Sequence, residues 1–424
     1  MAPALFTATL GLSALSTAVA FAPSFPYTAE KVRGVNLGGW LVLEPWITPS
    51  LFDATGNEAI IDEWTFGQYQ DVEIATTALK QHWDTWITED DFAQIAAAGL
   101  NHVRLPIGYW AFEVGPGEPY IQGQLPYFQK AVEWAEKYGL YVVADLHGVP
   151  DSQNGYDNSG QHMPYPRFWG NDTSYERALA VVQTMMDLWG NKSDVVSIVE
   201  PMNEPAGWYS SLALKEATQY WLDTYPIVRH PNGDGSESNT IHLAHDAFQN
   251  VSYWHDFESP EDGYVGVGMD THFYHVFSED EINLTMDGHL ELACAQKAVL
   301  ENFTMMIITD CTLYLNGRNA TIGQRYDGTY AGSTYHGSCT LSGYTGDASL
   351  YTDEYKAFLR KFWEAQVQTW EAGGDGWFQW AWKIENGTMH GEEWSYQRGL
   401  QFGWIPANVT DFKYPNICDS YSSF

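Results

Sequence analysis

Short apolar runs alternate with longer amphipathic stretches along the whole chain. The runs are rich in β-branched and aromatic residues and are flanked by polar or glycine positions, a pattern typical of strands buried on both faces. Eight such strands are predicted: Arg33–Leu37, His102–Pro106, Tyr141–Leu146, Ser197–Met202, Thr240–His245, Val265–Thr271, Phe303–Ile308 and Gly376–Trp382.

The stretches between these runs have the periodicity of amphipathic helices. Thr88 and Asp91 form a capping pair at the start of one helix. Residues 127–138 repeat apolar side chains at helical spacing and stop before Gly139, and residues 355–371 show the same pattern. Helices therefore follow strands in regular alternation.

Eight strands that alternate with helices predict a closed (β/α)8 TIM barrel. We expect one α/β domain with loop insertions over residues 21–424, a usual length for this fold. A doubly wound sheet is the structural alternative, but no Gly-x-Gly-x-x-Gly motif follows the first strand.

Polar and aromatic residues recur where the predicted strands end. In a barrel these ends meet at one rim, where the active site lies. The residues are Asn36, Arg104, His147, Asn203, Glu204, His245, Asp246, His272, Tyr274, Trp382 and Lys383. Repeated convergence of this kind indicates a functional site rather than isolated rim groups.

Charge and composition narrow the class of ligand. The chain has 424 residues with 20 Lys and Arg against 54 Asp and Glu, a formal net charge of −34. Such a charge repels phosphate backbones and anionic lipids, so we expect neither a nucleic acid nor a membrane as partner. The 19 Trp, 26 Tyr and 20 Phe residues suit stacking on sugar rings, although most of them should be buried. Carboxylate repulsion also predicts an acidic working range.

Three features predict export. Residues 1–20 are free of charged side chains and carry a short apolar segment that ends in small residues, which is typical of a signal peptide. Four cysteines, an even number, suggest two disulfides in an oxidising compartment, with three pairings open. Asn-x-Ser/Thr sequons occur at Asn171, Asn191, Asn250, Asn283, Asn302, Asn319, Asn386 and Asn408. We expect a glycoprotein that is secreted or held in the cell wall.

The segment EPMNEP, residues 200–205, is the sharpest local motif. Glu204 should lie at the end of the fourth strand, beside Asn203 and among aromatic residues. Burial there should raise the pKa of Glu204, which would let the carboxyl group donate a proton near neutrality.

These motifs together resemble fungal secreted exo-β-1,3-glucanases of glycoside hydrolase family 5. The resemblance covers nearly the whole chain after residue 20 and implies a retaining, double-displacement mechanism. The segments that carry it are RGVNLGGWLVLEPWITPS (33–50), NHVRLPIGYW (101–110), DLHGVPDSQNGYDNSG (145–160), EPMNEP, GEEWSYQRG (391–399) and YPNIC (414–418).

The resemblance implies a role for each site residue. Glu204 corresponds to the general acid/base and Asn203 to its partner for the sugar 2-hydroxyl. Trp382 resembles the aromatic floor under the cleaved glucose, and Tyr156 and Phe277 the pair of rings that grips the next sugar. Further residues resemble those that hold this glucose or orient the nucleophile: Glu44, Arg104, His147, His272 and Tyr274. The family also implies the pairings Cys294–Cys418 and Cys311–Cys339.

The resemblance does not extend to the catalytic nucleophile. A retaining enzyme needs a second carboxylate about 5–5.5 Å from the first. The family has it in a Gly-Glu-Trp motif before Thr-Asp-Cys. Here Thr309–Cys311 is present but the preceding strand reads FTMMII, with an isoleucine (Ile307 or Ile308) near the expected position. A missing stretch of sequence, an inactive enzyme and a substitute carboxylate all remain open.

The sequence contains carboxylates that could replace the nucleophile: Asp310, Glu301, and the pair Glu392 and Glu393 that precedes a tryptophan. The main functional prediction is thus a hydrolase that releases glucose from β-1,3-glucan. The alternative is a catalytically impaired β-glucan-binding protein of the cell wall, because stacking and hydroxyl hydrogen bonds survive the loss of one carboxylate.

Other chemistries have weaker support. His272 and His275 are spaced i and i+3 and point to opposite faces of a strand, so we expect no metal site. No Gly-x-Ser-x-Gly elbow is present to support an esterase. We expect no cofactor, a β-glucan polysaccharide or oligosaccharide as partner, and a monomer.

Overall fold

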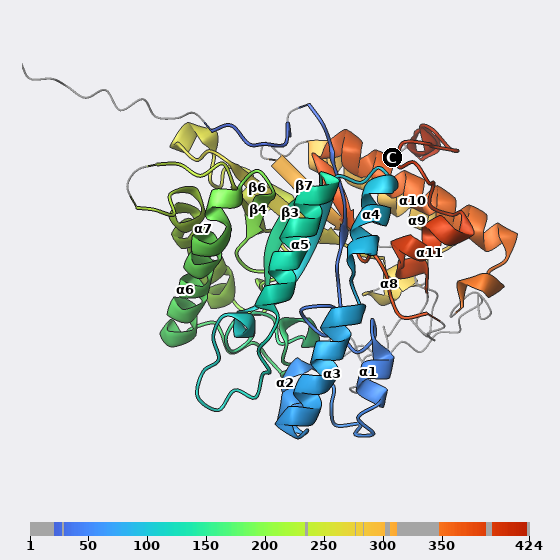
Figure 1. The fold of residues 1–424 in the computed structure, drawn as a ribbon. Coiled ribbons are helices and arrows are strands. Elements are labelled where there is room, and N and C mark those ends of the chain that lie inside the picture. Colours follow the sequence, from blue (N-terminus) through green and yellow to red (C-terminus); the bar gives the residue numbers. More distant parts are fainter. Residues whose placement is uncertain are drawn as a thin grey trace, which may run out of the picture.

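Eight parallel strands form a closed barrel in the order β1 to β8 in this computed structural model. The strands are β1 (Val32–Asn36), β2 (His102–Gly108), β3 (Tyr141–Gly148), β4 (Val196–Glu200), β5 (Ile241–His245), β6 (Val267–Phe273), β7 (Met306–Cys311) and β8 (Gly376–Gln379). The predicted (β/α)8 class is confirmed (Figure 1).

The structure describes residues 21–27, 29–233, 236–275, 277–282, 284–301, 306–311, 347–386 and 392–421. The predicted signal peptide, residues 1–20, lies outside this range, as do the sequons at 283, 302 and 319. Within the described residues, no helix combines the length and the apolar composition needed to cross a bilayer.

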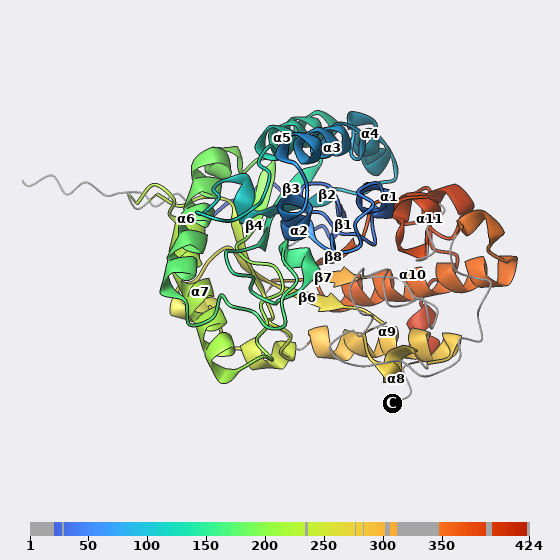
Figure 2. The same cartoon turned by 90° about the horizontal axis from the view of Figure 1, so that it is seen from below.

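Helices surround the barrel, as the view in Figure 2 shows. They are α1 (Pro49–Asp53), α2 (Glu63–Gln68), α3 (Val72–Thr85), α4 (Glu89–Ala97), α5 (Leu125–Tyr138), α6 (Asp172–Trp189), α7 (Ser211–Arg229), α8 (Glu279–Ile282), α9 (Met286–Glu301), α10 (Asp353–Gly373) and α11 (Tyr396–Phe402). The predicted capping box of Thr88 and Asp91 begins α4, and Gly139 ends α5 in the left-handed conformation.

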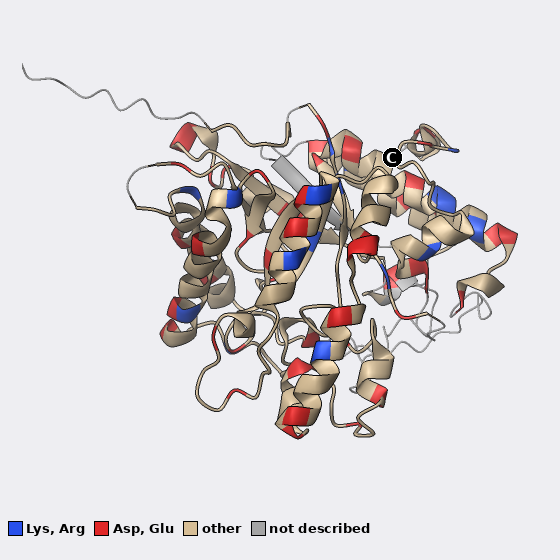
Figure 3. Cartoon of the chain, viewed as in Figure 1, with Lys and Arg blue, Asp and Glu red and all other residues tan. Residues whose placement is uncertain are grey.

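Acidic residues are spread over these outer helices, with fewer basic residues between them (Figure 3). Inside the barrel, side chains are arranged in layers. At the amino-terminal end, Phe25 and Tyr27 pack against inward side chains of the strands, including Val143, Ile198 and Phe378. This apolar layer closes one end of the barrel and leaves the other end for polar groups.

Backbone register closes the barrel on both sides of β7. Gly268 to Phe273 of β6 pair with Met306 to Cys311, and Ile308 to Cys311 pair with Gly376 to Gln379 of β8. The strand begins and ends three residues later than the predicted Phe303–Ile308. Thr309, Asp310 and Cys311 therefore belong to the strand rather than to the loop after it.

One predicted disulfide is confirmed. Cys294 of α9 is bonded to Cys418 in the carboxy-terminal segment, across 124 residues of sequence. A cross-link over so long a loop restricts the unfolded chain and stabilises the fold by roughly 2–4 kcal/mol. The predicted partner of Cys311, Cys339, lies outside the described residues.

Candidate active site

A fully buried arginine organises the floor of the site. Arg104 lies 2.8 Å from Glu200 and 3.0 Å from Asp145, and all three side chains have no exposed area. Its guanidinium also donates to the side-chain oxygen of Asn203 at 2.8 Å. Burial raises the pKa of Glu200, and the positive charge of Arg104 opposes this rise. The ion pairs thus hold a charged layer directly above the apolar one.

Arg104 thereby fixes the orientation of Asn203. The amide oxygen is occupied by the guanidinium, and the buried Nδ2 atom has no hydrogen-bond partner within the protein. Asn203 also lines the cavity described below. Its amide group is therefore positioned to donate to a ligand hydroxyl, while Arg104 itself does not line the cavity. The resemblance implies that Arg104 holds the glucose or orients the nucleophile; this geometry gives it no direct contact with the cavity, and it reaches the site through Asn203.

Glu204 follows β4 by four residues and adopts a φ of 46°. This left-handed conformation is unfavourable for a glutamate and is typical of residues that a site constrains. Its Oε1 atom lies 2.6 Å from Nδ1 of His272, and its Oε2 atom accepts from Asn158 at 3.0 Å. The carboxylate is therefore held at both oxygens.

The pKa of Glu204 differs from the sequence-based expectation. Burial alone raises it, as predicted. However, the hydrogen bond from His272 and the charges of His272, His245 and His147 outweigh burial and lower the pKa to about 2. The resting residue is therefore a carboxylate, and the expected raised pKa is wrong because the sequence does not reveal the histidine contact.

His147 is oriented by Asp145, whose carboxylate accepts from Nδ1 at 2.6 Å. The ring lies nearly parallel to that of Trp380, with centroids 5.7 Å apart and planes at 7°. Its Nε2 atom has no partner within the protein, and the residue lines the cavity. Asp145, tied to Arg104, thus aims a polar ring nitrogen at the ligand space.

These groups surround a cavity at the carboxyl ends of the strands. Carboxylates, histidines, amides and aromatic rings all contribute. The lining residues are Glu44, Trp46, His147, Tyr156, Asp157, Asn158, Asn203, Glu204, His272, Tyr274, Phe277, Trp380 and Trp394. Convergent polar groups with aromatic walls are typical of a small-ligand site.

Glu44 is the second carboxyl group of the cavity wall that the sequence analysis named. Burial and the neighbouring charge of Asp157 raise its pKa well above the usual range. Its Oε2 atom accepts from the indole of Trp46 at 2.9 Å, and Oε1 has no partner within the protein. A protonated Glu44 can donate a hydrogen bond to a ligand hydroxyl from this position.

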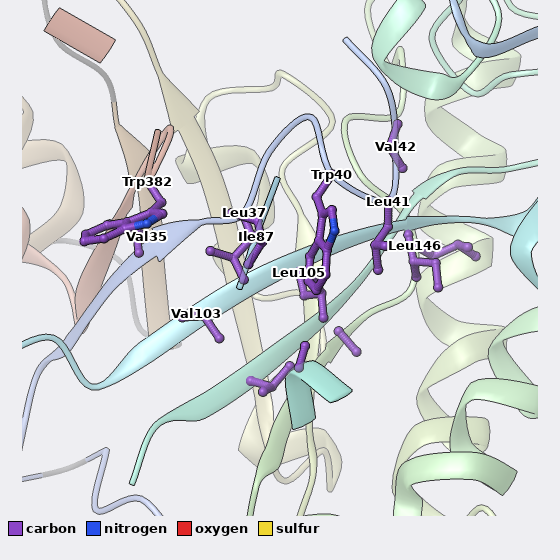
Figure 4. Close-up of a cluster of buried hydrophobic side chains, with 14 of the residues drawn as sticks. Val35, Leu37, Trp40, Leu41, Val42, Ile87, Val103, Leu105, Leu146 and Trp382 are labelled. Carbon is purple, nitrogen blue, oxygen red and sulfur yellow. The ribbon is translucent and has the colours of Figure 1, made fainter. Parts of the chain in front are cut away.

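Trp382 does not lie where the sequence analysis placed it. It is fully buried, donates from Nε1 to Asp91 at 2.8 Å, and packs in the apolar cluster that contains Val35 and Leu37 (Figure 4). Trp380 lines the cavity instead. The prediction was wrong because β8 ends at Gln379 rather than at residue 382.

The structure thus brings together Glu44, His147, Tyr156, Asn203, Glu204, His272, Tyr274 and Phe277 as predicted lining residues. Sequence reasoning missed Trp46, Asp157, Asn158, Trp380 and Trp394. The same strand-end rule identifies Trp380 once the strand stops at Gln379. Asp157 and Asn158 lie in a quoted motif but in a loop, where strand periodicity gives no signal.

Three of the carboxylates proposed from the sequence as a substitute nucleophile form contacts elsewhere in the structure. Glu301 ends α9, about half exposed, and pairs with Lys297 on the outer surface. Glu392 pairs with Arg398, and Glu393 accepts from the hydroxyl of Tyr351, so both are committed elsewhere.

Asp310 occupies the register position beside His272, in β7 at the same level of the barrel. Its side chain lies outside the part of the structure that is described.

Two groups of described side chains have the composition of a metal site, and His272 belongs to both: one adds Glu204 and His245, the other Glu200 and Asp270. Ligand atoms of Glu204, His245 and His272 lie within 4.8 Å of one another. However, Nδ1 of His245 accepts from the backbone N–H of Ala247, so its proton is on Nε2, and His272 already bridges two carboxylates. His275 contacts His289 rather than His272. The geometry fits an ion-pair network better than a metal.

Comparisons with known proteins place the chain in a family. The family model described as Cellulase (glycosyl hydrolase family 5) matches residues 67–386. "Glucan 1,3-beta-glucosidase" of Blumeria graminis is 39% identical over 429 residues, covering 98% of this chain and 96% of that protein. "Glucan 1,3-beta-glucosidase" of Candida oleophila is 41% identical over 409 residues, covering 92% of each. The crystal structure of rutinosidase from Aspergillus niger has a TM-score of 0.70 at 18% identity, covering 90% of this chain and 99% of that one, and supports the fold alone.

Proposed function

The chain belongs to glycosyl hydrolase family 5, and from this premise we propose that it is a glucan 1,3-β-glucosidase that releases glucose from the ends of β-1,3-glucan chains. The observation that carries the proposal is Glu204, held by His272 in a cavity with aromatic walls. Relatives that are 39% and 41% identical over nearly the whole chain have this activity in their names.

The acid/base role falls to Glu204 together with His272. The proton that the leaving oxygen needs resides on the imidazole at rest, 2.6 Å from the Glu204 carboxylate. As negative charge develops on the glycosidic oxygen, Glu204 takes up this proton from His272 and passes it to the leaving oxygen, which leaves His272 neutral and Glu204 again a carboxylate. In the second half of the reaction the same carboxylate accepts a proton from water.

Sugar binding falls to the remaining lining residues. Trp380 offers a flat apolar face beside His147, and Asn203 and Glu44 offer unpartnered polar atoms for hydroxyl groups. Tyr156 and Phe277 supply aromatic rings farther along the cavity wall. The site so arranged takes a terminal glucosyl unit and the unit that follows it.

We propose retention of configuration, which requires a nucleophile. Of the carboxylates considered from the sequence, Asp310 is the one that remains at the level of His272. Retention also distinguishes this function from the alternative of an inactive glucan-binding protein, which the relatives do not favour.

We further propose that the protein is exported and acts as a monomer, with residues 21–424 as its single catalytic domain. Residues 1–20 have the composition of a signal peptide. The disulfide between Cys294 and Cys418 suits an oxidising compartment. The sequons at Asn191 and Asn408 are candidates for glycosylation.

The test is glucose release from laminarin, followed by proton NMR of the first anomer formed. We expect β-glucose first, and loss of roughly 10²–10⁴-fold in rate for Glu204→Gln. Glu301→Gln, on the exposed face of α9, is the matched control and should keep full activity. No glucose from the unmutated chain contradicts the function, and α-glucose first contradicts retention.

Asp310 is tested separately. The Asp310→Asn variant should lose turnover of an activated aryl β-glucoside, and azide should restore it by attacking the anomeric carbon in place of the carboxylate. Full activity of Asp310→Asn excludes Asp310 as nucleophile and leaves the acid/base assignment of Glu204 intact.

A further inference from the structure

Trp208 lies just outside the cavity, in the loop that follows β4 and four residues after Glu204. The backbone N–H of Ala206 donates to the carbonyl of Gln153 at 3.1 Å, and that of Tyr209 donates to Ala206 at 2.9 Å. The loop is thus a hydrogen-bonded turn, which restricts the backbone around Trp208.

The same turn is tied to the catalytic residues. The side chain of Gln153 donates to the carbonyls of His147 and Asn203, both at 2.8 Å. A Cβ atom at Gly207 would lie 2.6 Å from the carbonyl oxygen of Ala247, so the turn packs closely on the loop after β5. Trp208 therefore has a set position relative to Glu204.

The indole of Trp208 is unusually exposed for its size. Its exposed fraction is 51%, and its neighbours Tyr209 and Leu212 are exposed by 43% and 47%. Exposing large apolar groups in one short segment costs stability unless they contact a ligand or partner. The segment is continuous with the cavity through the ring of Tyr156. The ring of Trp208 lies 6.4 Å from that of Tyr156, with planes at 24°.

Tyr156 lines the cavity, whereas Trp208 does not. The two nearly parallel rings therefore continue the aromatic wall from the inside of the cavity to its outer edge. We propose that Trp208 is an additional sugar-binding platform, which stacks on the second glucosyl unit on the leaving-group side of a β-glucan chain. This inference rests on the proposed function and extends it to the substrate's length.

The chemistry fits a neutral sugar better than other occupants. An indole face binds the C–H face of a pyranose by dispersion and by release of water, and needs no charge on the ligand. A chain with a net charge of −34 repels polyanions from this edge. Platform binding predicts a preference for trisaccharides and longer chains over disaccharides.

A structural role for Trp208 predicts a different result. If the indole only supports Tyr156, its removal weakens the grip on the first leaving-group unit, and disaccharides suffer as much as trisaccharides. Substrate length therefore separates the two roles.

The experiment compares kcat/KM for laminaribiose and laminaritriose in the unmutated protein and in Trp208→Ala. We expect the ratio of triose to biose to fall roughly two- to tenfold in Trp208→Ala, with laminaribiose unchanged. Trp208→Phe keeps a ring and should keep most of the ratio. Tyr69→Ala, an exposed aromatic at the end of α2 that does not line the cavity, is the matched control.

Three outcomes overturn the inference. An unchanged ratio in Trp208→Ala shows that the indole binds no sugar, and an equal loss for both substrates assigns it a supporting role only. In both cases the unmutated protein still releases glucose, and the proposed function stands. If the unmutated protein cleaves neither oligosaccharide, the proposed function fails and this inference fails with it.

Discussion

His272 places one ring nitrogen 2.6 Å from Glu204 and the other 3.4 Å from Asp270. Burial alone would lower the pKa of this imidazole, but the two carboxylates outweigh burial and raise it well above the usual range. The same contact holds the pKa of Glu204 at about 2. The pair thus titrates as one unit, with its proton on the histidine at rest.

Replacing His272 by Gln should therefore raise the pKa of Glu204 above its ordinary value of 4.5. The positive charge and its hydrogen bond disappear, whereas burial, which disfavours the carboxylate, remains. The measurement is a carbon-13 NMR titration of protein labelled at the glutamate carboxyl carbon, with Glu204→Gln to assign the signal. A Glu204 pKa that stays near 2 in His272→Gln contradicts the pairing.

Trp380 and Trp382 should respond in opposite ways to substitution. Trp380→Ala removes a cavity wall, so we expect kcat/KM for laminaribiose to fall by roughly tenfold or more with little change in stability. Trp382→Phe removes the hydrogen bond to Asp91, so we expect a loss of about 1–3 kcal/mol in stability with KM unchanged. Steady-state kinetics and urea unfolding of both variants decide the assignment. A raised KM in Trp382→Phe alone would restore the prediction made from sequence.

Arg104 should matter chiefly for folding. Arg104→Met leaves Glu200 and Asp145 buried without their positive partner, which costs about 3–5 kcal/mol. The double variant Arg104→Met with Glu200→Gln removes one of those charges and should recover part of the loss. Urea unfolding of the three proteins measures both effects. A loss below about 1 kcal/mol in Arg104→Met would show that water reaches this layer.

Much of the fold could be predicted from the sequence because its signals are local. Buried parallel strands produce continuous apolar runs, and capping residues such as Thr88 mark helix starts. All eight strands lie where the pattern placed them, with ends displaced by a few residues. Of the residues predicted at the strand ends, five line one cavity, because a closed barrel brings those ends together. They are His147, Asn203, Glu204, His272 and Tyr274, whereas Asn36, Arg104, His245, Asp246, Trp382 and Lys383 do not line it.

The errors arise where neighbouring strands decide the outcome. The end of β8 depends on its pairing with β1 and β7, and this pairing stops at Gln379. The apolar pattern alone extended the strand to residue 382, so the prediction chose Trp382 instead of Trp380. The pKa of Glu204 depends on a histidine 68 residues away, which no local motif reveals. Both errors concern partners that are distant in sequence and adjacent in space.

The pKa values of buried carboxyl groups determine how the free energy of unfolding depends on pH. Burial raises the pKa of Glu393 to about 8, although the hydroxyl of Tyr351 opposes the rise. Burial likewise raises the pKa values of Glu63 and Asp246 to about 7. A raised pKa in the folded state contributes stability that is fully present below the unfolded pKa, near 4.5 for a glutamate. It is lost as the pH rises through the folded value.

Buried histidines with lowered pKa values act in the opposite direction, but only below their unfolded value. The pKa values of His82 and His289 are lowered to about 4, mainly by burial, so their contribution changes between about pH 4 and 6.5. His272, with its raised pKa, loses its contribution as the pH rises above 6.5, as the carboxyl groups do. The free energy of unfolding should therefore fall between pH 6.5 and 8, in keeping with an acidic working range.

Glu393→Gln isolates one member of this set. The amide cannot ionise. The free energy of unfolding of this variant should therefore fall less steeply between pH 6.5 and 8 than that of the unmutated protein, by up to about 1.4 kcal/mol per pH unit. The measurement is urea unfolding at several pH values between 6 and 8.5, and the slope against pH is compared rather than the absolute stability. This choice matters because replacing a buried hydrogen-bonded carboxyl group changes stability at every pH. Glu301→Gln, which alters an exposed carboxylate, should keep the slope of the unmutated protein. Equal slopes for Glu393→Gln and the unmutated protein would show that Glu393 is ionised in the fold, with Tyr351 outweighing its burial.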